Sequence, residues 1–576
     1  MAFSDLLEQV GSTGRFQVLH VTLLSMPILM MASHNLLQNF VAAVPPHHCA
    51  PHANISMSSM SAGDMLRATV PLGTNSKPER CRRYTHPQWQ LLSSNSSESL
   101  WEEGVEEIEM QSCEDGWYYN VTEMSSTIIT EWDLVCDQRA LKQMSQTTYM
   151  GGVLVGAVIF GGLSDRFGRR VLLLISNLMM AVGGTCAAFS TSLTMFCIFR
   201  ICCGMALSGV VLNSFSLIVE WIPTRVRTVV GTGTGYCYTT GQLILAAVAY
   251  CIRDWRWLTL AVSLPFYVSF LYSWWFLESA RWLVLTKRSD QAVNNLKTVA
   301  RINGRRAEAD KINLEMLQES MKKEIDCSKG SYSALDLLRT SSMRTITVCL
   351  SAVWFSTSFA YYGLSMDLQK FGVSIYLIQI IFGAVDIPAK ILVTISMSML
   401  GRRPSQCGAL VLAGVMILIN LLVPYDLQVL RTSLAVIGKG CLAASFNCCY
   451  LYSGELYPTV IRQNGMGCVS MMARIGAMVA PMVLLLGEDF PWLPGFIYGG
   501  APILSGIFAF FLPETLAQPL PDTIQDKFQV NMIKTTKGYE GVSLNLNDKW
   551  CGVSSYFFLT VINMLKILFT CTKREK

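Results

Sequence analysis

One arginine stands alone in an otherwise apolar stretch, "SMMARIGAMVAP" at residues 470–481. If this stretch spans a membrane, an uncompensated guanidinium costs about 2.5–3.5 kcal/mol on insertion scales, so such a residue usually faces a cavity or a partner. Its planar fork of donors suits a carboxylate or a sulfonate. Arg474 is therefore a candidate ligand for an anion, and the alternative is a structural ion pair with a buried acid.

Asp386 is the only acid well inside an apolar run of the C-terminal half, and Lys390 follows it by four residues. This order places acid and base on one helix face and favours an ion pair between them. If Asp386 neutralises Lys390, the lysine is structural; if Lys390 turns into a cavity, it is a second cation for an anion. With Arg474, these residues would give an empty cavity about one net positive charge, which is costly in a low-dielectric core until an anion binds.

Aromatic and amide side chains near the centres of apolar runs could complete a pocket of broad specificity. The hydroxyls of the adjacent Tyr361 and Tyr362 would need partners at membrane depth, whereas ordinary helix packing is the alternative for each ring. Asn35 and Asn39 lie one turn apart on one face, where packing between helices is the alternative. The candidate residues for the pocket are Met31, Asn35, Asn39, Tyr236, Tyr238, Trp354, Phe359, Tyr361, Tyr362, Phe446 and Tyr450.

The composition predicts a membrane protein, because 51% of the 576 residues are hydrophobic, only 15% are charged and the mean hydropathy is +0.38. A membrane-spanning helix needs about 20 mostly apolar residues. Twelve such runs occur, at 17–44, 144–163, 171–190, 195–219, 229–251, 257–277, 346–366, 374–399, 407–424, 432–452, 464–486 and 496–512. We therefore expect an all-α membrane fold with two sets of six helices.

The distribution of Lys and Arg on short loops predicts the orientation. Basic residues follow the second run, in "SDRFGRR", and the eighth, in "GRRP", which places these loops in the cytosol together with both chain termini. We expect a cytosolic N-terminus at 1–16, a six-helix half at 17–277, a cytosolic loop at 278–345, a second half at 346–512 and a cytosolic tail at 513–576. In the cytosolic loop, "SDQAVNNLKTVARING" predicts an amphipathic helix that ends at Asn303 and Gly304.

The large loop at 45–138 is predicted to be extracellular, because it holds the three glycosylation sequons of the chain, at Asn54, Asn95 and Asn120. It also contains four cysteines, Cys49, Cys81, Cys113 and Cys136, which predict two disulfides whose pairing the sequence leaves open. A cleaved signal peptide is the rival interpretation of residues 1–44, but that run is too long and contains polar residues.

Two motifs recur in both halves with nearly the same offset. "EWIPTRVR" at 220–227 recurs as "ELYPTVIR" at 455–462, an offset of 235, and "FGRR" at 167–170 recurs as "LGRR" at 400–403, an offset of 233. Duplicated halves place a substrate site between them at the bilayer midplane, so this pattern indicates a carrier. Charges at the cytosolic helix ends could latch the halves while the carrier is open outward, although they could also serve only as topology determinants. These are Asp165, Arg166, Arg169, Arg170, Glu220, Arg227, Glu455 and Arg462.

The C-terminal tail carries a further apolar segment, "CGVSSYFFLTVINMLKILFTC" at 551–571, which contains Lys566. A thirteenth span would place the basic "TKREK" outside, against the positive-inside rule. We favour an interfacial helix or an alternative terminus with no role in transport.

Several motifs connect the chain to a known family. "GGLSDRFGRR" resembles the signature loop between helices two and three of the major facilitator superfamily, and "STIITEWDLVC", "ESARWL" and "GELYPTVIRQNGMG" are similar to the solute carrier 22 family. From residue 1 to about 526 the chain most resembles the organic anion transporters of that family, in the branch that carries para-aminohippurate, through "MASHNLLQNF", "IGKGCLAASFNC" and "LPETLAQPLPDTIQD".

The resemblance implies a polyspecific plasma-membrane carrier, basolateral in epithelium. It would take up organic anions such as para-aminohippurate-like carboxylates, drugs and urate-like metabolites in exchange for an intracellular dicarboxylate such as α-ketoglutarate, with chloride as a further candidate partner. It also implies that Lys390 and Arg474 bind the anion and that Tyr238, Tyr361, Tyr362 and Phe446 line the pocket.

The remaining function classes are disfavoured by the sequence. A carrier of organic cations or zwitterions is the main alternative, and Arg474 argues against it. The sequence contains no nucleotide loop, metal cluster or nucleophile motif, so we expect no enzyme, cofactor, metal or nucleic-acid partner.

Overall fold

The protein is described by a computed structural model. The described residues are 3–516, apart from 12–13, 52–60, 74–76, 90–91, 93–108, 322–335, 367, 372, 425, 459–460 and 488–489. Nine helices in this part of the chain are long and apolar enough to cross a membrane. Together with the comparisons reported below, they confirm the expected all-α membrane fold.

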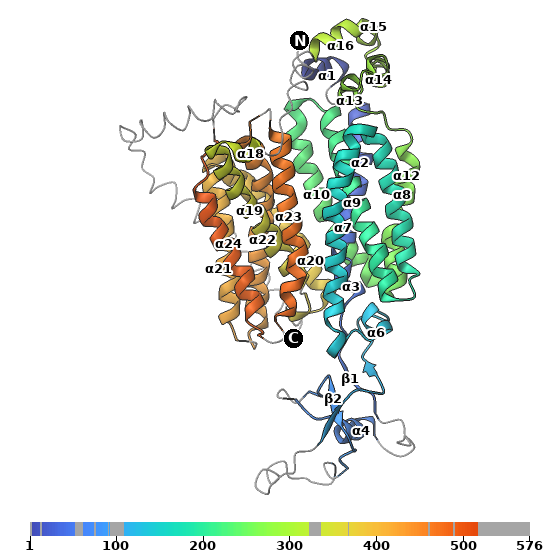
Figure 1. The fold of residues 1–576 in the computed structure, drawn as a ribbon, viewed down its shortest axis with the longest axis vertical. Coiled ribbons are helices and arrows are strands. Elements are labelled where there is room, and N and C mark those ends of the chain that lie inside the picture. Colours follow the sequence, from blue (N-terminus) through green and yellow to red (C-terminus); the bar gives the residue numbers. More distant parts are fainter. Residues whose placement is uncertain are drawn as a thin grey trace, which may run out of the picture.

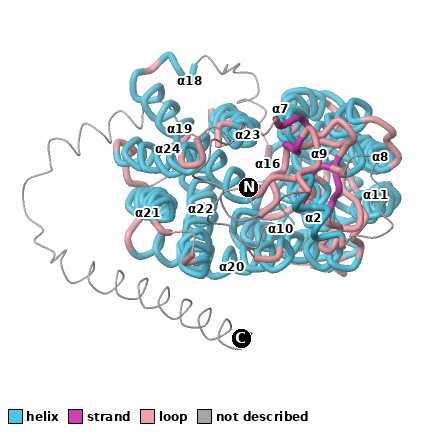
Figure 2. Tube along the Cα trace, turned by 90° about the horizontal axis from the view of Figure 1, so that it is seen from below, coloured by secondary structure: helices cyan, strands magenta, loops and turns pink. Residues whose placement is uncertain are grey.

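Helices occupy all six apolar runs predicted for the N-terminal half. The first run forms α2 (Arg15–Leu36) and the short α3 (Gln38–Val41), and the sixth is divided near Pro265 into α11 (Trp255–Ser263) and α12 (Pro265–Ser273). The four runs between them form α7 (Ala140–Phe167), α8 (Arg169–Ala188), α9 (Leu193–Trp221) and α10 (Thr224–Cys251). These helices pack into one group (Figures 1 and 2).

The C-terminal half repeats this arrangement with six helices. They are α19 (Ser341–Ser365), α20 (Ile375–Met399), α21 (Arg402–Leu422), α22 (Gln428–Leu456), α23 (Arg462–Leu485) and α24 (Leu493–Phe510). Seen along the bundle in Figure 2, the two groups lie side by side. They meet where α7 contacts α23 and where α10 contacts α20.

Short helices lie at one end of the bundle, over the N-terminal half, and we call this end the linker end (Figure 1). They are α13 (Ala280–Leu285), α14 (Ser289–Ile302), α15 (Arg306–Lys311), α16 (Leu314–Ser320) and, from the N-terminus, α1 (Phe3–Gly11). The predicted amphipathic helix corresponds to α14, whereas α1 was not expected. Asn303 holds α1 in place, because its amide donates to Val10 O at 3.1 Å and its carbonyl oxygen accepts from Phe16 N at 2.9 Å.

A small loop domain projects from the opposite end, the loop end (Figure 1). It contains the helices α4 (Ala62–Thr69) and α6 (Ile128–Trp132) and two antiparallel strand pairs. In one pair β1 (His47–Cys49) faces β4 (Trp117–Tyr119), and in the other β2 (Arg82–Tyr84) faces β3 (Met110–Ser112). Of the three cysteine pairings left open by the sequence, the structure has Cys49–Cys113 and Cys81–Cys136.

The predicted glycosylation sites and tail are only partly covered. Asn120 is exposed in the loop domain, whereas Asn54, Asn95 and the apolar segment 551–571 lie outside the described residues.

Candidate functional site

The two halves are held together at the loop end. Gln369 and Val44 exchange two hydrogen bonds, from Val44 N to Gln369 Oε1 at 3.2 Å and from Gln369 Nε2 to Val44 O at 3.0 Å. The Tyr376 hydroxyl donates to Glu123 O of the loop domain at 2.8 Å, and its ring stacks on Phe40. The structure is therefore a state of the bundle that is closed at the loop end.

Asp386 forms its ion pair with a lysine of another helix. Lys439 Nζ on α22 lies 3.1 Å from Asp386 Oδ1, and both side chains are 1% exposed. Of the two alternatives left open for Lys390, the ion pair with Asp386 on the same helix is therefore not the one that the structure shows. A buried carboxylate pairs with whichever cation lies within reach, and here the neighbouring helix α22 supplies that cation. Lys439 also donates to Phe382 O at 3.1 Å and lies 4.5 Å from the ring of Tyr361.

The second oxygen of Asp386 connects the two halves. Asp386 Oδ2 accepts from the Tyr361 hydroxyl at 3.2 Å and from Gln242 Nε2 of α10 at 3.2 Å. Gln242 Nε2 also lies 3.2 Å from the Tyr361 hydroxyl. Buried polar groups are stable only when they are hydrogen-bonded, and this network binds both carboxylate oxygens. Asp386 is thus neutralised by Lys439, and the N-terminal half contacts it through a neutral amide.

Lys390 reaches across the interface to uncharged oxygens. Its ammonium donates to Gly235 O and to Thr239 Oγ1 of α10, both at 2.8 Å, and lies 5.8 Å from the ring of Tyr236. Because Asp386 is paired with Lys439, the hydrogen-bond partners of the Lys390 amine are uncharged oxygens and not a carboxylate. An anion that entered the interface could replace these oxygens.

Arg474 lies on α23 among aromatic rings and is half-buried. Tyr450 and Tyr362 are the groups that interact with it electrostatically, and the ion pairs recorded for the described residues do not include it. Tyr450 is 58% exposed although its ring packs edge-on against Trp354 at 4.6 Å. An accessible tyrosine beside an arginine without a carboxylate partner defines a surface that an anion can contact.

The other predicted rings divide into two groups. Phe446 contacts Trp354 and Tyr361, with ring centroids 6.3 and 5.3 Å away, and thus lies between these two rings. Trp354 itself is buried, and its indole N–H donates to Ser453 Oγ at 2.8 Å. Phe359, in contrast, packs against Tyr498 at 5.0 Å within the C-terminal half, in agreement with ordinary helix packing.

The predicted residues of the first run also reach the interface. Asn35 Oδ1 accepts from the Tyr149 hydroxyl at 2.9 Å, and Asn35 Nδ2 lies 3.5 Å from the Tyr362 hydroxyl. Asn39 Nδ2 donates to Ser365 O at 2.8 Å, at the closed loop end. Tyr238, a further predicted residue, interacts electrostatically with Tyr362. Met31 packs against the large apolar cluster of the N-terminal half, against which Tyr362 also packs.

The repeated charges form equivalent networks at the linker end, one within each half. In the N-terminal half Arg169 lies 3.0 Å from Asp165 and 3.4 Å from Glu220. In the C-terminal half Arg402 binds Glu455 through two hydrogen bonds, of 3.1 and 3.0 Å. In this state each pair joins helices of one half, and a latch between the halves stays a prediction for the opposite state.

The other predicted charges of the linker end contact nearby backbone or rings. Arg170 donates to Trp274 O, and the guanidinium of Arg166 lies 5.6 Å from the ring of Phe167. Arg227 donates to Val219 O at 3.2 Å and Arg462 to Tyr457 O at 3.3 Å.

A helix cap that the sequence analysis did not identify completes each network. The Glu278 carboxylate accepts from Arg169 N and Arg170 N, and the Glu514 carboxylate accepts from Arg402 N and Arg403 N, all between 2.9 and 3.2 Å. The helix N-terminus favours an acid, because its first N–H groups have no partner in the helix. The glycine before each helix has a positive φ, +96° at Gly168 and +107° at Gly401, which few other residues tolerate.

Two buried cations of the bundle helices were missed by the sequence analysis. Lys439 stands in the tenth apolar run, in "IGKGCLA", and Arg200 in the fourth, in "IFRICC"; in both cases a lone charge in an apolar run was the available signal. Arg200 is 1% exposed, lies 4.0 Å from the ring of Tyr149 and donates to His34 O at 3.4 Å.

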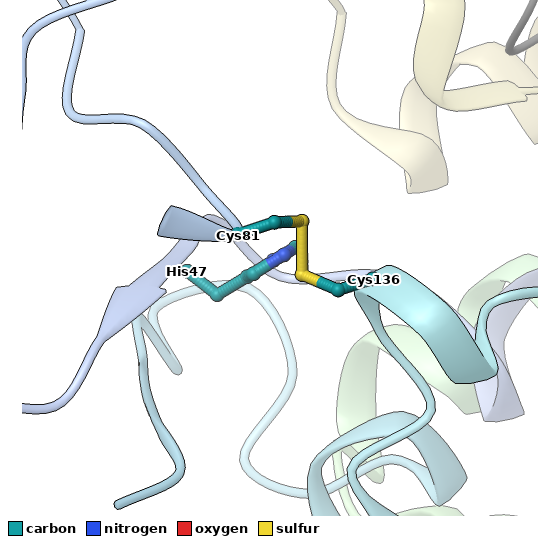
Figure 3. A group of neighbouring side chains, drawn as sticks. All are labelled: His47, Cys81 and Cys136. Carbon is teal, nitrogen blue, oxygen red and sulfur yellow. A yellow bond between two sulfur atoms is a disulfide. The ribbon is translucent and has the colours of Figure 1, made fainter. Parts of the chain in front are cut away.

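A possible metal site in the loop domain is excluded by its sulfur chemistry. Among the residues that the structure describes, His47, Cys81 and Cys136 form the group whose ligand atoms lie close enough to share an ion. Figure 3 shows that the two sulfur atoms are bonded to each other. A metal would require thiolates, which a disulfide does not supply.

Comparison with known sequences assigns most of the chain to one family. The model of the family described as "Sugar (and other) transporter" matches residues 111–526. Solute carrier family 22 member 6 from Danio rerio is 86% identical over 96% of this chain and 99% of its own length. The proteins of the same name from Pseudopleuronectes americanus and Oryctolagus cuniculus are 68% and 53% identical, over 95% and 91% of this chain and 98% and 94% of their own lengths.

Comparison with solved structures supports the fold. A partially occluded inward-open conformation of the xylose transporter XylE from E. coli aligns with a TM-score of 0.55 and 16% sequence identity, covering 87% of this chain and 98% of that one. Its inward-open conformation aligns with a TM-score of 0.53 and 19% identity, covering 67% of this chain and 88% of that one. At this level of identity the likeness concerns the fold alone.

Proposed function

The chain belongs to the organic anion transporter subfamily of solute carrier family 22, within the major facilitator superfamily, and we propose that it exchanges extracellular organic anions for intracellular dicarboxylate. It is a multi-pass membrane transporter and not an enzyme. The proposed substrates are para-aminohippurate-like carboxylates, drugs and urate-like metabolites, and the proposed counter-substrate is a dicarboxylate such as α-ketoglutarate.

The charge of the site is the observation that carries this proposal. Asp386 is neutralised by Lys439, while Lys390 contacts uncharged oxygens and Arg474 lies among tyrosines. A carrier of cations would need negative charge in its site, whereas the two remaining charged groups are positive. The expected excess of one positive charge is therefore revised to two, because Lys439 was not counted. This arrangement favours an anionic ligand over the cations or zwitterions of the alternative function.

The position of the cations suggests how binding is coupled to movement. Lys390 joins the C-terminal half to α10, and Arg474 lies on α23, which contacts α7 of the other half. Both cations thus lie next to the surfaces that must separate and close during alternating access. Moving two uncompensated charges through a low-dielectric core is unfavourable, and a bound anion reduces that cost. We therefore expect exchange of one anion for another to be faster than net uptake.

The proposed orientation places the loop domain outside the cell and the linker end in the cytosol. In this orientation the structure faces inward, because the halves are closed at the loop end. The glycosylation sequons and both disulfides would then lie in the oxidising compartment, and both termini in the cytosol. We place the carrier in the plasma membrane, basolateral in epithelium. In the opposite, outward-open state the charges of Glu220, Glu455 and their arginines are proposed to latch the two halves.

The first test is uptake of labelled para-aminohippurate into cells that express the full chain, with and without preloaded glutarate. We expect preloading to stimulate uptake and Arg474→Ala to abolish it. Arg474→Lys is the matched variant: it keeps the charge but loses the planar fork of donors, so a partial loss is expected.

Surface expression of each variant, measured by surface biotinylation, separates loss of transport from loss of folding. Equal influx with and without glutarate would contradict the exchange mechanism. Uptake of a quaternary ammonium in place of the anion, at normal surface expression, would show that Arg474 is structural and that the alternative function holds.

A further inference from the structure

A groove lies on the outer surface of the C-terminal half, between α23 and α24, with α19 at its base. Its volume is about 510 Å³. The lining residues are apolar or small, and they include Val348, Ala352 and Phe355 of α19, Met472 of α23, and Ala501 and Leu504 of α24. Figure 1 shows α19 between α24 and α23 in this region. The groove is separate from the cation site, because its lining contains none of the residues proposed to bind the transported anion.

The groove opens toward the lipid. Val348 and Leu504 are 52% and 60% exposed, and they lie on the bundle helices α19 and α24. The groove extends along α19 from Thr347 to Ser356, which at about 1.5 Å per residue is roughly 13 Å. This is close to half of the ~30 Å hydrocarbon core. The groove thus has the length of an acyl chain in a single leaflet, and it lies in the part of the bundle nearer the linker end.

A cation lies on α19 one helical turn before the first residue of the groove. Arg344 is exposed in the first turn of α19 at the linker end. It shares one helix face with Val348, Ser351 and Phe355, because the spacing 344, 348, 351, 355 follows the helix period. An arginine here can keep its guanidinium at the headgroup level while its stem covers apolar surface. The groove therefore combines an apolar slot with a positive charge at its membrane-surface end.

The equivalent gap in the N-terminal half is bridged by large side chains. Tyr272 of α12 donates from its hydroxyl to Leu23 O of α2 at 2.9 Å, and Phe276 packs edge-on against His20 at 5.1 Å. In the C-terminal half the corresponding bridge is made by the much smaller Ser505, whose hydroxyl donates to Ala352 O at 3.1 Å. Small residues on α24 thus leave the groove open, whereas aromatic residues fill the equivalent gap in the N-terminal half.

We propose that this groove binds one acyl chain of an anionic phospholipid from the linker-side leaflet, with the headgroup phosphate on Arg344. The bound chain contacts Phe355 of α19 and Met472 of α23, and the ring of Phe355 stacks on Phe359 at 5.7 Å. It therefore supports the packing of α23, the helix that carries Arg474. The inference does not depend on which solute is transported.

Photocrosslinking in nanodiscs tests this site with the full chain. The probe is a phosphatidylserine with a diazirine in its acyl chain, diluted in phosphatidylcholine, and the labelled peptides are located by mass spectrometry. We expect the label on peptides that contain Val348 and Leu504, and we expect unlabelled phosphatidylserine to compete better than phosphatidylcholine. Arg344→Ala should reduce this preference about fivefold, the effect of one basic residue at a membrane surface. Arg301→Ala, an exposed cytosolic arginine on α14, is the matched control and should leave the preference unchanged.

Filling the groove provides the second test. Ala352→Trp with Ala501→Trp should remove the label from both peptides, and Ser351→Phe is the milder variant if the double variant does not fold. Competition by unlabelled lipid on the unaltered chain remains informative even if both variants fail. Equal labelling of lipid-facing residues elsewhere, such as Ile391 and Ile395 of α20, would overturn the proposal, because it would indicate ordinary annular lipid. Labelling of the groove by a photoreactive sterol but not by phosphatidylserine would also overturn it.

Discussion

The two halves are nearly the same at the linker end and differ at their centres. At the linker end each half has a glycine with positive φ, a glutamate that caps the next helix and an arginine paired with a second glutamate. At its centre the C-terminal half contains Asp386, Lys439, Lys390 and Arg474. Among the described bundle helices of the N-terminal half the buried cation is Arg200, which contacts Tyr149 and a backbone carbonyl.

This difference separates two tasks of the molecule. The linker-end networks fix helix ends within each half, so both copies are needed and both keep the same residue types. The centre has to bind a ligand of one sign, and one half can supply the charge while the other supplies amides, hydroxyls and rings. Exchanging or weakening equivalent residues in the two halves tests this division directly.

The largest effect is expected from Lys439→Met, which removes the counter-charge of a carboxylate that is 1% exposed. Breaking one partner of a buried ion pair costs about 3–5 kcal/mol, because the other charge stays buried and unpaired. We expect a severe loss of folded protein at the cell surface and a large decrease of the unfolding temperature in detergent.

The matched control is the double variant Lys439→Met with Asp386→Asn. It leaves no unpaired charge at this position and should recover most of the lost stability. If Lys439→Met alone were as stable as the unaltered chain, Lys439 would not be the group that neutralises Asp386. The net charge of two for the site would then be wrong.

A smaller effect, on transport rather than stability, is expected from Lys390→Met. This change removes two hydrogen bonds of 2.8 Å to α10 and one of the two cations of the site. A charge-assisted hydrogen bond contributes about 1.5–3 kcal/mol, so we expect anion uptake at low concentration to fall roughly tenfold or more. Thr239→Val removes one neutral partner of the lysine but keeps its charge, and it should reduce uptake much less. Equal losses in both variants, measured as initial rates at equal surface expression, would indicate that Lys390 acts only as a structural contact.

The linker-end pairs predict an unequal response to the same conservative change. Arg402 binds Glu455 through two hydrogen bonds, whereas Arg169 approaches Glu220 at 3.4 Å and leaves its Nε without a hydrogen bond. Lysine cannot reproduce the two-pronged contact. Arg402→Lys should therefore cost about 1.5 kcal/mol and Arg169→Lys about 0.5 kcal/mol in stability. Thermal unfolding of both purified variants checks the order, and the reverse order would show that the networks differ in a way that these distances do not capture.

The sequence predicted the fold well because length and hydropathy determine it. A run of about 20 apolar residues forms a helix in a membrane wherever it lies, since every backbone group must be satisfied within the segment. Arg474 was predicted to be a ligand for a similar reason, because a lone charge in an apolar run needs a cavity or a partner in any packing, and this stays a prediction. Neither conclusion required knowledge of which helices touch.

The partner of Asp386 could not be predicted in the same way. The acid-before-base spacing favoured Lys390 on the same helix, but α22 brings Lys439 to the carboxylate and α10 offers oxygens to Lys390. Sequence spacing describes one helix at a time, and these partners are set by contacts between helices. The helix α1 was missed for a related reason, because Asn303, far along the chain, holds it against the linker helices.

The smallest effect concerns a hydroxyl that each half places on its paired glutamate. The Thr515 hydroxyl donates to Glu455 Oε2 at 2.6 Å, whereas Ser279 interacts with Glu220 electrostatically in the equivalent place and leaves Glu220 Oε2 without a hydrogen bond. The Thr515 bond should contribute about 1 kcal/mol, so Thr515→Val is expected to lower the unfolding temperature slightly and Ser279→Ala to lower it less. Because each hydroxyl supports a glutamate whose arginine partner is intact, neither change should alter the preference for anions over cations. Unfolding temperatures and uptake of both variants check this, and a change of substrate preference in either one would show that the linker end also takes part in selecting the ligand.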